Sequence, residues 1–357
     1  MVVALRREPS PFWRRARRHP PLAPQPLGPP LPPGTIVRVP GRGDVFVRYQ
    51  AGPPGAPTVL LVHGWMASAD LNWLGAFPAL ADRYHVVAMD VRGHGRGIRS
   101  SEPFSLEDCA DDAAALLREL GVPAVVAGYS MGGAIALLLA RRHPEVARGL
   151  VMVASAAELA RTGLGRGAHL GVPLLGLLLR AGLPDRVARE LARHRPLALG
   201  ALAQSAPWLA GELKRLHPAD VVAAGRAVAS FDARDWAGEL GLPAASVVTL
   251  RDRAVPAAKQ RATAMALDGH VVELDGGHGV CATEPEALGA ALRGAVDLVD
   301  EARRRRRHLR LASARWTTRR DGRRRPIAAR SAERQAPDRD RIVEPLEQAA
   351  AGGLEPG

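Results

Sequence analysis

The sequence predicts an α/β fold in which helices flank a mostly parallel central sheet, and three observations support this class. Short, continuous apolar runs recur along the chain, as is typical of parallel strands that are buried on both faces. Helical segments separate most of these runs, and a β-hairpin pattern precedes them. A hairpin followed by repeated strand–helix units indicates a doubly wound sheet.

The first predicted element is the β-hairpin. Apolar and polar residues alternate over residues 37–39 and again over residues 45–49, and the sequence Pro-Gly-Arg-Gly at 40–43 separates the two stretches. Alternation with a period of two is typical of strands, and Pro and Gly favour a tight turn. We therefore expect two antiparallel strands ahead of the main sheet.

Apolar strands and helices then alternate along the chain. The helix predicted over residues 106–120 begins after Ser105, a favourable N-cap, and ends at Gly121, whereas Pro144 ends the next helix. The predicted strands are residues 59–62, 85–89, 124–127, 150–154, 246–250 and 270–274. The predicted helices are residues 106–120, 131–143, 256–267 and 284–299.

One interval of the chain interrupts this alternation. Residues 156–240 show helical periodicity and no clear strand, although they lie between two predicted strands. We interpret them as a helical cap that is inserted into the core. The predicted organisation is a disordered Pro- and Arg-rich arm at 1–34, core at 35–155, cap at 156–240, core at 241–300, and an Arg-rich, mostly disordered tail at 301–357.

The net charge of +13 is concentrated at the two ends of the 357-residue chain. Six arginines against one glutamate give residues 1–34 a charge of +5, and sixteen arginines against eight acids give residues 301–357 a charge of +8. The body of the chain therefore carries no net formal charge. The basic ends would attract nucleic acid or an anionic membrane, but no nucleic-acid-binding motif accompanies them, which favours solvated tails.

The two cysteines, Cys109 and Cys281, are too few for a disulfide framework, and neither has the spacing of a metal ligand. We interpret them as free thiols of a cytoplasmic protein. Cys281 lies three residues after His278, so it is either a thiol with a chemical role or a small buried residue at the start of a helix, and the second is favoured. No metal or organic cofactor is expected.

The sequence Gly128-Tyr129-Ser130-Met131-Gly132 contains the pattern G-x-S-x-G. An apolar strand leads into it and an apolar helix leads out, which is the strand–turn–helix setting of a nucleophile elbow. The two glycines let neighbouring backbone pass close, and the N-terminus of the helix favours developing negative charge. We therefore predict that Ser130 is a catalytic nucleophile.

A serine hydroxyl needs a general base, and His278 is the predicted one. It lies in a glycine-rich loop directly after a predicted strand. Asp252 follows another strand at its carboxyl end, where functional loops gather, and is predicted to fix the tautomer of His278 through Nδ1. Its arginine neighbours offer a second interpretation, a surface ion pair. The less suitable alternatives for the acid are Asp232, Asp235 and Asp275.

A tetrahedral intermediate needs two backbone N–H donors, which form an oxyanion hole. Met131, directly after the nucleophile, is predicted to supply one donor. Trp65, in the His63-Gly64-Trp65-Met66 loop after an apolar strand, is predicted to supply the other. His63 is expected to order this loop and not to act as a base. The Trp65 and Met66 side chains are predicted either to line the substrate pocket or to pack.

Four blocks of sequence resemble one family in kind and order. They are His-Gly-Trp at 63–65, Asp-Val-Arg-Gly-His-Gly at 90–95, Gly-Tyr-Ser-Met-Gly-Gly at 128–133, and Asp252 with Gly277-His278. Over about residues 58–280 the chain resembles the α/β-hydrolases, which include esterases, lipases, non-haem chloroperoxidases and C–C hydrolases. The resemblance implies the α/β-hydrolase fold and gives the block at 90–95 a structural role in a turn.

The residue at the nucleophile position narrows this resemblance to the serine esterase and chloroperoxidase-like branch. Epoxide hydrolases and haloalkane dehalogenases of this fold carry Asp where this chain has Ser130. We therefore predict a serine hydrolase that cleaves a carboxylic ester or related acyl substrate through an acyl-enzyme. Thioester, C–C and perhydrolysis chemistry use the same triad and stay open, as does a ligand receptor or regulator without turnover.

The predicted partner is a small-molecule acyl substrate. Residues 164–183 are rich in leucine. Packing of these leucines onto the core is the favoured interpretation, and an apolar entrance for lipophilic esters is the alternative.

Overall fold

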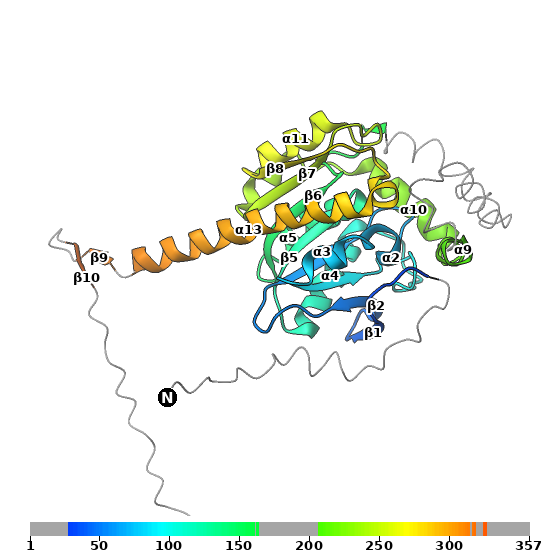
Figure 1. Cartoon of the computed structure of the whole chain (residues 1–357), viewed down its shortest axis with the longest axis horizontal. Helices are drawn as coiled ribbons and strands as arrows, with labels where there is room; N and C mark the ends of the chain where they lie inside the picture. The colour runs from blue at the N-terminus through cyan, green and yellow to red at the C-terminus, as the bar shows by residue number, and fades with distance from the viewer. Residues whose placement is uncertain (1–27, 161, 164–205, 315, 319–323, 327–357) are drawn as a thin grey trace, which may run out of the picture. The chain divides into compact units, whose positions relative to one another are not determined.

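A computed structural model describes residues 28–160, 162–163, 206–314, 316–318 and 324–326. The chain divides into two compact units, Met1–Arg307 and His308–Gly357. The first unit contains the central sheet and the helices that cover it (Figure 1).

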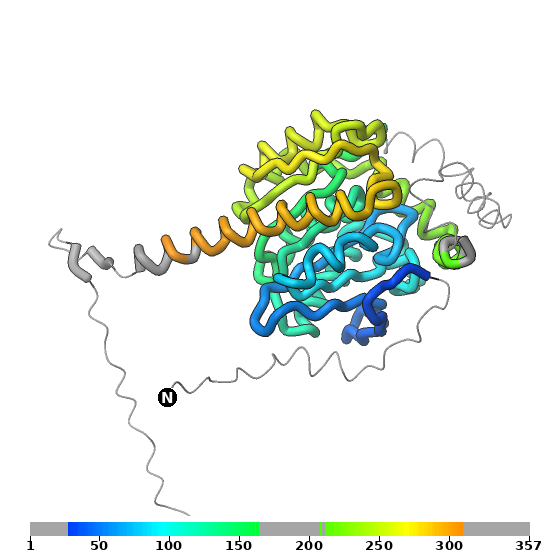
Figure 2. Tube along the Cα trace, viewed as in Figure 1, coloured from blue at the N-terminus to red at the C-terminus, as the bar shows by residue number. Residues whose placement is uncertain are grey.

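Eight strands form the central sheet in the order β1-β2-β4-β3-β5-β6-β7-β8, and Figure 2 follows the chain from one edge to the other. β2 pairs antiparallel with both of its neighbours, and every pair from β4 to β8 is parallel. The predicted hairpin and mostly parallel sheet are therefore confirmed. The strands are β1 Gly34–Val39, β2 Gly43–Gln50, β3 Thr58–Val62, β4 His85–Met89, β5 Ala124–Tyr129, β6 Ala147–Val153, β7 Ala244–Thr249 and β8 His270–Leu274.

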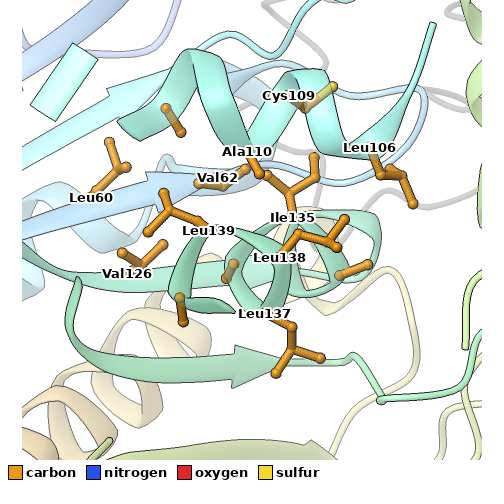
Figure 3. Packing of buried hydrophobic residues seen from close by; sticks show 14 of the residues in the cluster. Leu60, Val62, Leu106, Cys109, Ala110, Val126, Ile135, Leu137, Leu138 and Leu139 are labelled. Carbon is orange, nitrogen blue, oxygen red and sulfur yellow. The ribbon is translucent and has the colours of Figure 1, made fainter. Parts of the chain in front are cut away.

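Helices cover both faces of the sheet. Leu60 and Val62 of β3 belong to one apolar cluster, whereas Val59 and Leu61 belong to the other, as the two-residue period of a strand requires. Helices α4 and α5 pack on the first face (Figure 3), and α2, α3 and the first part of α13 pack on the second (Figure 1). These helices are α2 Ala69–Trp73, α3 Ala76–Leu80, α4 Leu106–Leu120, α5 Met131–Arg142 and α13 Pro285–Ala314.

β8 differs from the prediction that the apolar runs are buried on both faces. It is the last strand of the sheet, so it has a neighbouring strand on one side only, and His270 and Val271 are exposed. Two short helices flank its turns, α11 Ala257–Ala266 before it and α12 Val280–Thr283 after it. The run at 270–274 is therefore an edge strand.

The described part of the predicted cap contains α9 Ala206–Lys214 and α10 Pro218–Ser230, followed by the short 3-10 helix η1 Ala237–Leu240. Glu212 of α9 is buried, accepts a hydrogen bond from Ser68 Oγ at 2.6 Å and lies 3.6 Å from the Arg96 guanidinium. Burial raises the pKa of Glu212. The leucine-rich segment at 164–183 lies outside the described residues, so the cap as a whole stays a prediction.

The ends of the chain are described in part. Residues 1–27 and 327–357 lie outside the described residues, so their predicted disorder stays a prediction. Within the second unit, β9 Trp316–Thr318 and β10 Arg324–Pro326 pair antiparallel. None of the helices that the structure describes combines the length and the apolar character that a membrane span requires.

Candidate active site

Ser130 lies in the tight turn between β5 and α5. Its backbone has φ 53° and ψ −115°, a conformation that non-glycine residues rarely adopt. A Cβ atom on Gly128 would lie 2.1 Å from the carbonyl oxygen of Gly132, and one on Gly132 would lie 2.1 Å from that of Val62. The two glycines of the motif are therefore required by close backbone packing, as the elbow pattern predicts.

A continuous line of hydrogen bonds joins the three residues that the sequence selects. Ser130 Oγ lies 2.9 Å from His278 Nε2, and His278 Nδ1 lies 2.8 Å from Asp252 Oδ2. Ser130 is 3% exposed and the Asp252 side chain is fully buried, whereas the His278 side chain is 25% exposed. The imidazole is thus the member of this line that solvent reaches most readily.

The loop after β7 fixes both oxygens of the Asp252 carboxylate. Oδ1 accepts hydrogen bonds from the backbone N–H groups of Ala254 and Val255, both at 2.8 Å. Oδ2 accepts from Thr249 Oγ1 at 2.9 Å as well as from His278. Because a carboxylate can only accept, His278 carries its proton on Nδ1 and leaves Nε2 free to accept the serine proton.

Gln260 of α11 supports this arrangement, and neither it nor Thr249 was selected from the sequence. Its Nε2 donates to Thr249 Oγ1 at 2.8 Å and to the Val255 carbonyl at 2.7 Å, and its Oε1 accepts from the Thr249 backbone N–H at 3.0 Å. The sequence feature that could have pointed to Gln260 is its place one turn into the helix that follows Asp252. This feature becomes informative only when α11 is known to pack against the end of β7.

The alternatives for the acid lie elsewhere or have other partners. Asp275 is exposed and pairs with Arg251 at 2.8 Å. Asp232 pairs with Arg234 at 2.6 Å, and Asp235 is exposed. The structure therefore brings Asp252, and none of the three alternatives, to the imidazole.

The loop after β3 is ordered by a buried histidine. His63 Nδ1 donates to the Gly64 carbonyl at 2.8 Å, and His63 Nε2 accepts from the backbone N–H of Val91 at 2.8 Å. Burial lowers the pKa of His63, so the ring stays neutral, as accepting at Nε2 requires. This geometry agrees with the expectation that His63 orders the loop.

Trp65 and Met66 continue the same loop, and Trp65 contacts α10. The Trp65 indole N–H donates to the Val221 carbonyl of α10 at 2.8 Å, and the ring packs against Ala229 of the same helix. Met66 is half-buried and has φ 60°, a left-handed backbone. The residues at 164–205 lie outside the described part of the chain, so the pocket role of Trp65 and Met66 stays a prediction.

Two residues that the sequence did not select lie between the loops of the site. The Tyr129 hydroxyl donates to the backbone carbonyl of His278, and its ring lies 5.9 Å from the imidazole. Asn72 of α2 contacts both Gly64 and Cys281. Burial raises the pKa of the Cys281 thiol, which favours the structural interpretation of this cysteine.

The described residues were also compared with the side-chain arrangements that bind metal ions. Among them, no cluster of three or more histidine, cysteine or acidic side chains has the arrangement of a metal site.

The chain is similar to curated proteins that include esterases and a lipase. It is 34% identical over 166 residues to a pimeloyl-(acyl-carrier protein) methyl ester esterase of Neisseria meningitidis, a match of 44% of this chain and 62% of that protein. It is 31% identical over 144 residues to the mouse sn-1-specific diacylglycerol lipase ABHD11, a match of 40% and 45%. A third match, 36% over 116 residues, is to the dihydrolipoyllysine-residue acetyltransferase component of the acetoin cleaving system of Pseudomonas putida, and covers 32% and 31%. The chain thus spans less than two thirds of each of these relatives.

Solved structures with the same fold cover most of this chain. An enol-lactonase from Burkholderia xenovorans superposes with a TM-score of 0.61 at 21% identity, over 74% of this chain and 99% of its own. A thermophilic esterase from Thermogutta terrifontis gives 0.60 at 24%, over 74% and 98%. Likeness at this identity shows the fold alone. Because the family described as the alpha/beta hydrolase fold matches residues 57–285, more than half of the chain, this protein belongs to the α/β-hydrolase fold family.

Proposed function

We propose that this protein is a serine hydrolase that cleaves a carboxylic ester, or a related acyl compound, through an acyl-enzyme on Ser130. The observation that carries the proposal is the line of hydrogen bonds from Asp252 through His278 to Ser130. Membership of the α/β-hydrolase family and the esterases among the relatives support it.

In the acylation step His278 Nε2 takes the proton of the Ser130 hydroxyl while Oγ attacks the carbonyl carbon. The electron pair of the C=O π bond moves to oxygen, and Asp252 stabilises the imidazolium that forms. When the intermediate collapses, the bond to the alcohol oxygen breaks and His278 gives its proton to that oxygen. Water then repeats the sequence on the acyl-enzyme, which releases the carboxylic acid and restores Ser130.

The backbone N–H groups of Trp65 and Met131 are the proposed donors to the oxyanion. Met131 is the first residue of α5, and N–H groups at a helix N-terminus lack intrahelical acceptors. A Cβ atom on Gly64 would lie 3.3 Å from the Ser130 Cβ, so the backbone before Trp65 runs directly beside the nucleophile. Both donors thus belong to segments that border Ser130.

The proposed substrate class is a carboxylic ester with an alkyl acyl group. The names of two relatives describe carboxylic esters, a methyl ester of an acyl-carrier-bound chain and a diacylglycerol. The half-buried side chains of Trp65 and Met66, which follow Gly64 in the loop after β3, are the proposed wall of the acyl pocket.

Covalent labelling tests the nucleophile. A fluorophosphonate probe is expected to label the wild-type protein at Ser130, with fluoride as the leaving group, and not to label Ser130→Ala. Ser230→Ala, which removes an exposed hydroxyl at the end of α10, is the matched control and should label fully. Labelling that persists in Ser130→Ala would overturn the proposal.

Turnover separates an enzyme from a receptor with the same residues. A panel of p-nitrophenyl esters from acetate to decanoate should be hydrolysed by the wild-type protein, and Ser130→Ala should lower kcat by about 10⁴-fold or more. Stoichiometric labelling without turnover of any ester would favour the receptor. A preference for acetate would count against a lipophilic acyl pocket.

A further inference from the structure

Asn72 of α2 lies between two loops of the candidate site and is buried, with 6% of its surface exposed. Its Oδ1 accepts a hydrogen bond from the backbone N–H of Gly64 at 2.7 Å. Its Nδ2 donates to Cys281 Sγ at 3.2 Å. Because a backbone N–H can only donate, the amide oxygen must face Gly64, and the orientation of the whole side chain follows.

The hydrogen bond to Gly64 fixes one of two successive peptide planes. The Gly64 N–H belongs to the peptide that joins it to His63, and Asn72 holds that plane. The Gly64 carbonyl belongs to the next peptide, which also contains the Trp65 N–H, and His63 Nδ1 holds that plane. Between two fixed planes the φ and ψ of a glycine, the most permissive residue, have little freedom. The direction of the Trp65 N–H therefore depends on both hydrogen bonds.

The other end of Asn72 contacts the loop that carries the imidazole. Cys281 lies in α12, three residues after His278. Tyr129, which precedes the nucleophile, donates from its hydroxyl to the His278 carbonyl. Burial, with the neighbouring Cys281 thiol, raises the pKa of Tyr129 well above its ordinary value, so the hydroxyl stays a donor. Trp73, next to Asn72 on α2, packs edge-on against the Tyr129 ring at 6.0 Å.

We propose that Asn72 is a positioning residue for the hydrolysis reaction: it orients the Trp65 N–H toward the oxyanion and links the loop after β3 to the histidine loop through Cys281. The inference rests on the proposed function and adds a residue outside the triad and the oxyanion donors. The two hydrogen bonds of the Asn72 side chain are to Gly64 and Cys281, so Asn72 acts on the oxyanion donor through Gly64.

The test compares Asn72→Ala, Cys281→Ala and the double variant in the full-length chain. Rates are expressed per active site, counted by fluorophosphonate titration, so that unfolded protein does not enter kcat. Asn72→Ala should lower kcat by about 10- to 100-fold with little change in KM, since a misdirected oxyanion donor costs less than the loss of one. Cys281→Ala should give a smaller loss, and the double variant should match Asn72→Ala alone, because both act through one bridge.

A transition-state mimic separates positioning from general destabilisation. A trifluoromethyl ketone forms a charged hemiketal on the serine, and its affinity should fall in parallel with kcat in Asn72→Ala. The matching methyl ketone should bind unchanged. Tyr84→Phe removes a partly buried hydrogen bond to Asp297 of α13, outside the site, and should lower stability while kcat per site stays at the wild-type value.

The outcomes separate this inference from the proposed function. If wild-type protein neither labels at Ser130 nor hydrolyses esters, the function fails. If wild type is active and Asn72→Ala keeps its kcat and trifluoromethyl ketone affinity, Asn72 is not a positioning residue. Should Asn72→Ala not fold, Asn72→Ser, with a hydroxyl too short to reach Gly64, gives the same comparison. Loss of folded protein in both variants would overturn the claim that Asn72 acts on the reaction.

Discussion

The two carboxylate oxygens of Asp252 accept hydrogen bonds from different groups. This difference determines the expected effect of replacing Asp252 by asparagine. In Asp252→Asn the amide oxygen can still accept from the N–H groups of Ala254 and Val255, so the loop is expected to keep its form. The amide nitrogen then faces His278 Nδ1 and forces that atom to accept. The proton moves to Nε2, which can no longer take the proton of Ser130.

Asp252→Asn is therefore expected to lower kcat for a p-nitrophenyl ester by about 10⁴-fold while thermal stability changes little. Asp275→Asn, which changes an exposed aspartate paired with Arg251, is the control and should stay within twofold of wild type. Steady-state kinetics and a thermal melt measure both effects. A loss smaller than tenfold in Asp252→Asn would show that this carboxylate does not set the tautomer.

At the residue scale, the sequence was sufficient to select the candidate site residues that follow strands. It was not sufficient to select the residues whose hydrogen bonds orient them. Ser130, Asp252 and His278 each lie in the turn or loop that follows an apolar strand, and strand ends of a parallel sheet meet at one edge. Thr249 and Asn72 are ordinary polar residues in the sequence. Their roles depend on which loop lies beside them, and this information exists only in the folded chain.

At the scale of elements, the turn between β5 and α5 leaves no room for a side chain at its first glycine. Gly128→Ala would place a Cβ atom 2.1 Å from the backbone oxygen of Gly132, and backbone cannot move without shifting α5. We expect the free energy of unfolding to fall by about 3 kcal/mol or more, or the protein to become insoluble.

Gly294 provides the matched control for this substitution. It lies inside α13, and an added Cβ meets no atom within 4 Å among the described residues. Gly294→Ala is expected to raise the free energy of unfolding by about 0.5–1 kcal/mol, because alanine is the better helix former. Urea titration measures both variants. Equal stability of Gly128→Ala and wild type would mean that the elbow does not require this glycine.

Long helices with a clear period could be predicted from the sequence, whereas helices of five residues could not. The helix at Leu106–Leu120 has an N-cap hydrogen bond from Asp108 N–H to Ser105 Oγ and a left-handed Gly121 at its end, and both signals are visible in the sequence. Helices α2 and α3 have five residues each, too few to show a helical period. They form because their apolar residues, such as Trp73 and Phe77, pack against the second face of the sheet.

At the scale of the whole molecule, two buried histidines connect folding to pH. His63 and His94 are fully buried, with ring centroids 5.7 Å apart. Burial, with His63 close by, lowers the pKa of His94 to about 3, whereas an unfolded chain has a histidine pKa of about 6.5. Between these values the unfolded state binds the extra proton. The stability that the neutral ring contributes is therefore present above about pH 6.5 and is lost as the pH falls toward 3.

His94→Asn should flatten this dependence. The asparagine amide keeps an N–H near the position of Nδ1, which donates to the Arg92 carbonyl at 3.1 Å, and it does not titrate. The slope of unfolding free energy against pH between 6 and 4 should decrease by up to about 1.4 kcal/mol per pH unit. His270→Asn, an exposed histidine of β8, is the control. An unchanged slope in His94→Asn would exclude His94 as the source of acid sensitivity.

The hydrogen bond between Ser130 and His278 also has a consequence for the order of folding. It joins residues 148 positions apart, whereas the bond from His278 to Asp252 joins residues only 26 positions apart. A growing chain that has left the ribosome as far as α5 already contains Ser130 but not His278, its proposed base. Closing a loop of that length costs entropy that only docking of β7 and β8 offsets. The proposed triad is thus completed last, and under the proposed mechanism a nascent or truncated chain would not hydrolyse acyl compounds before its sheet is complete.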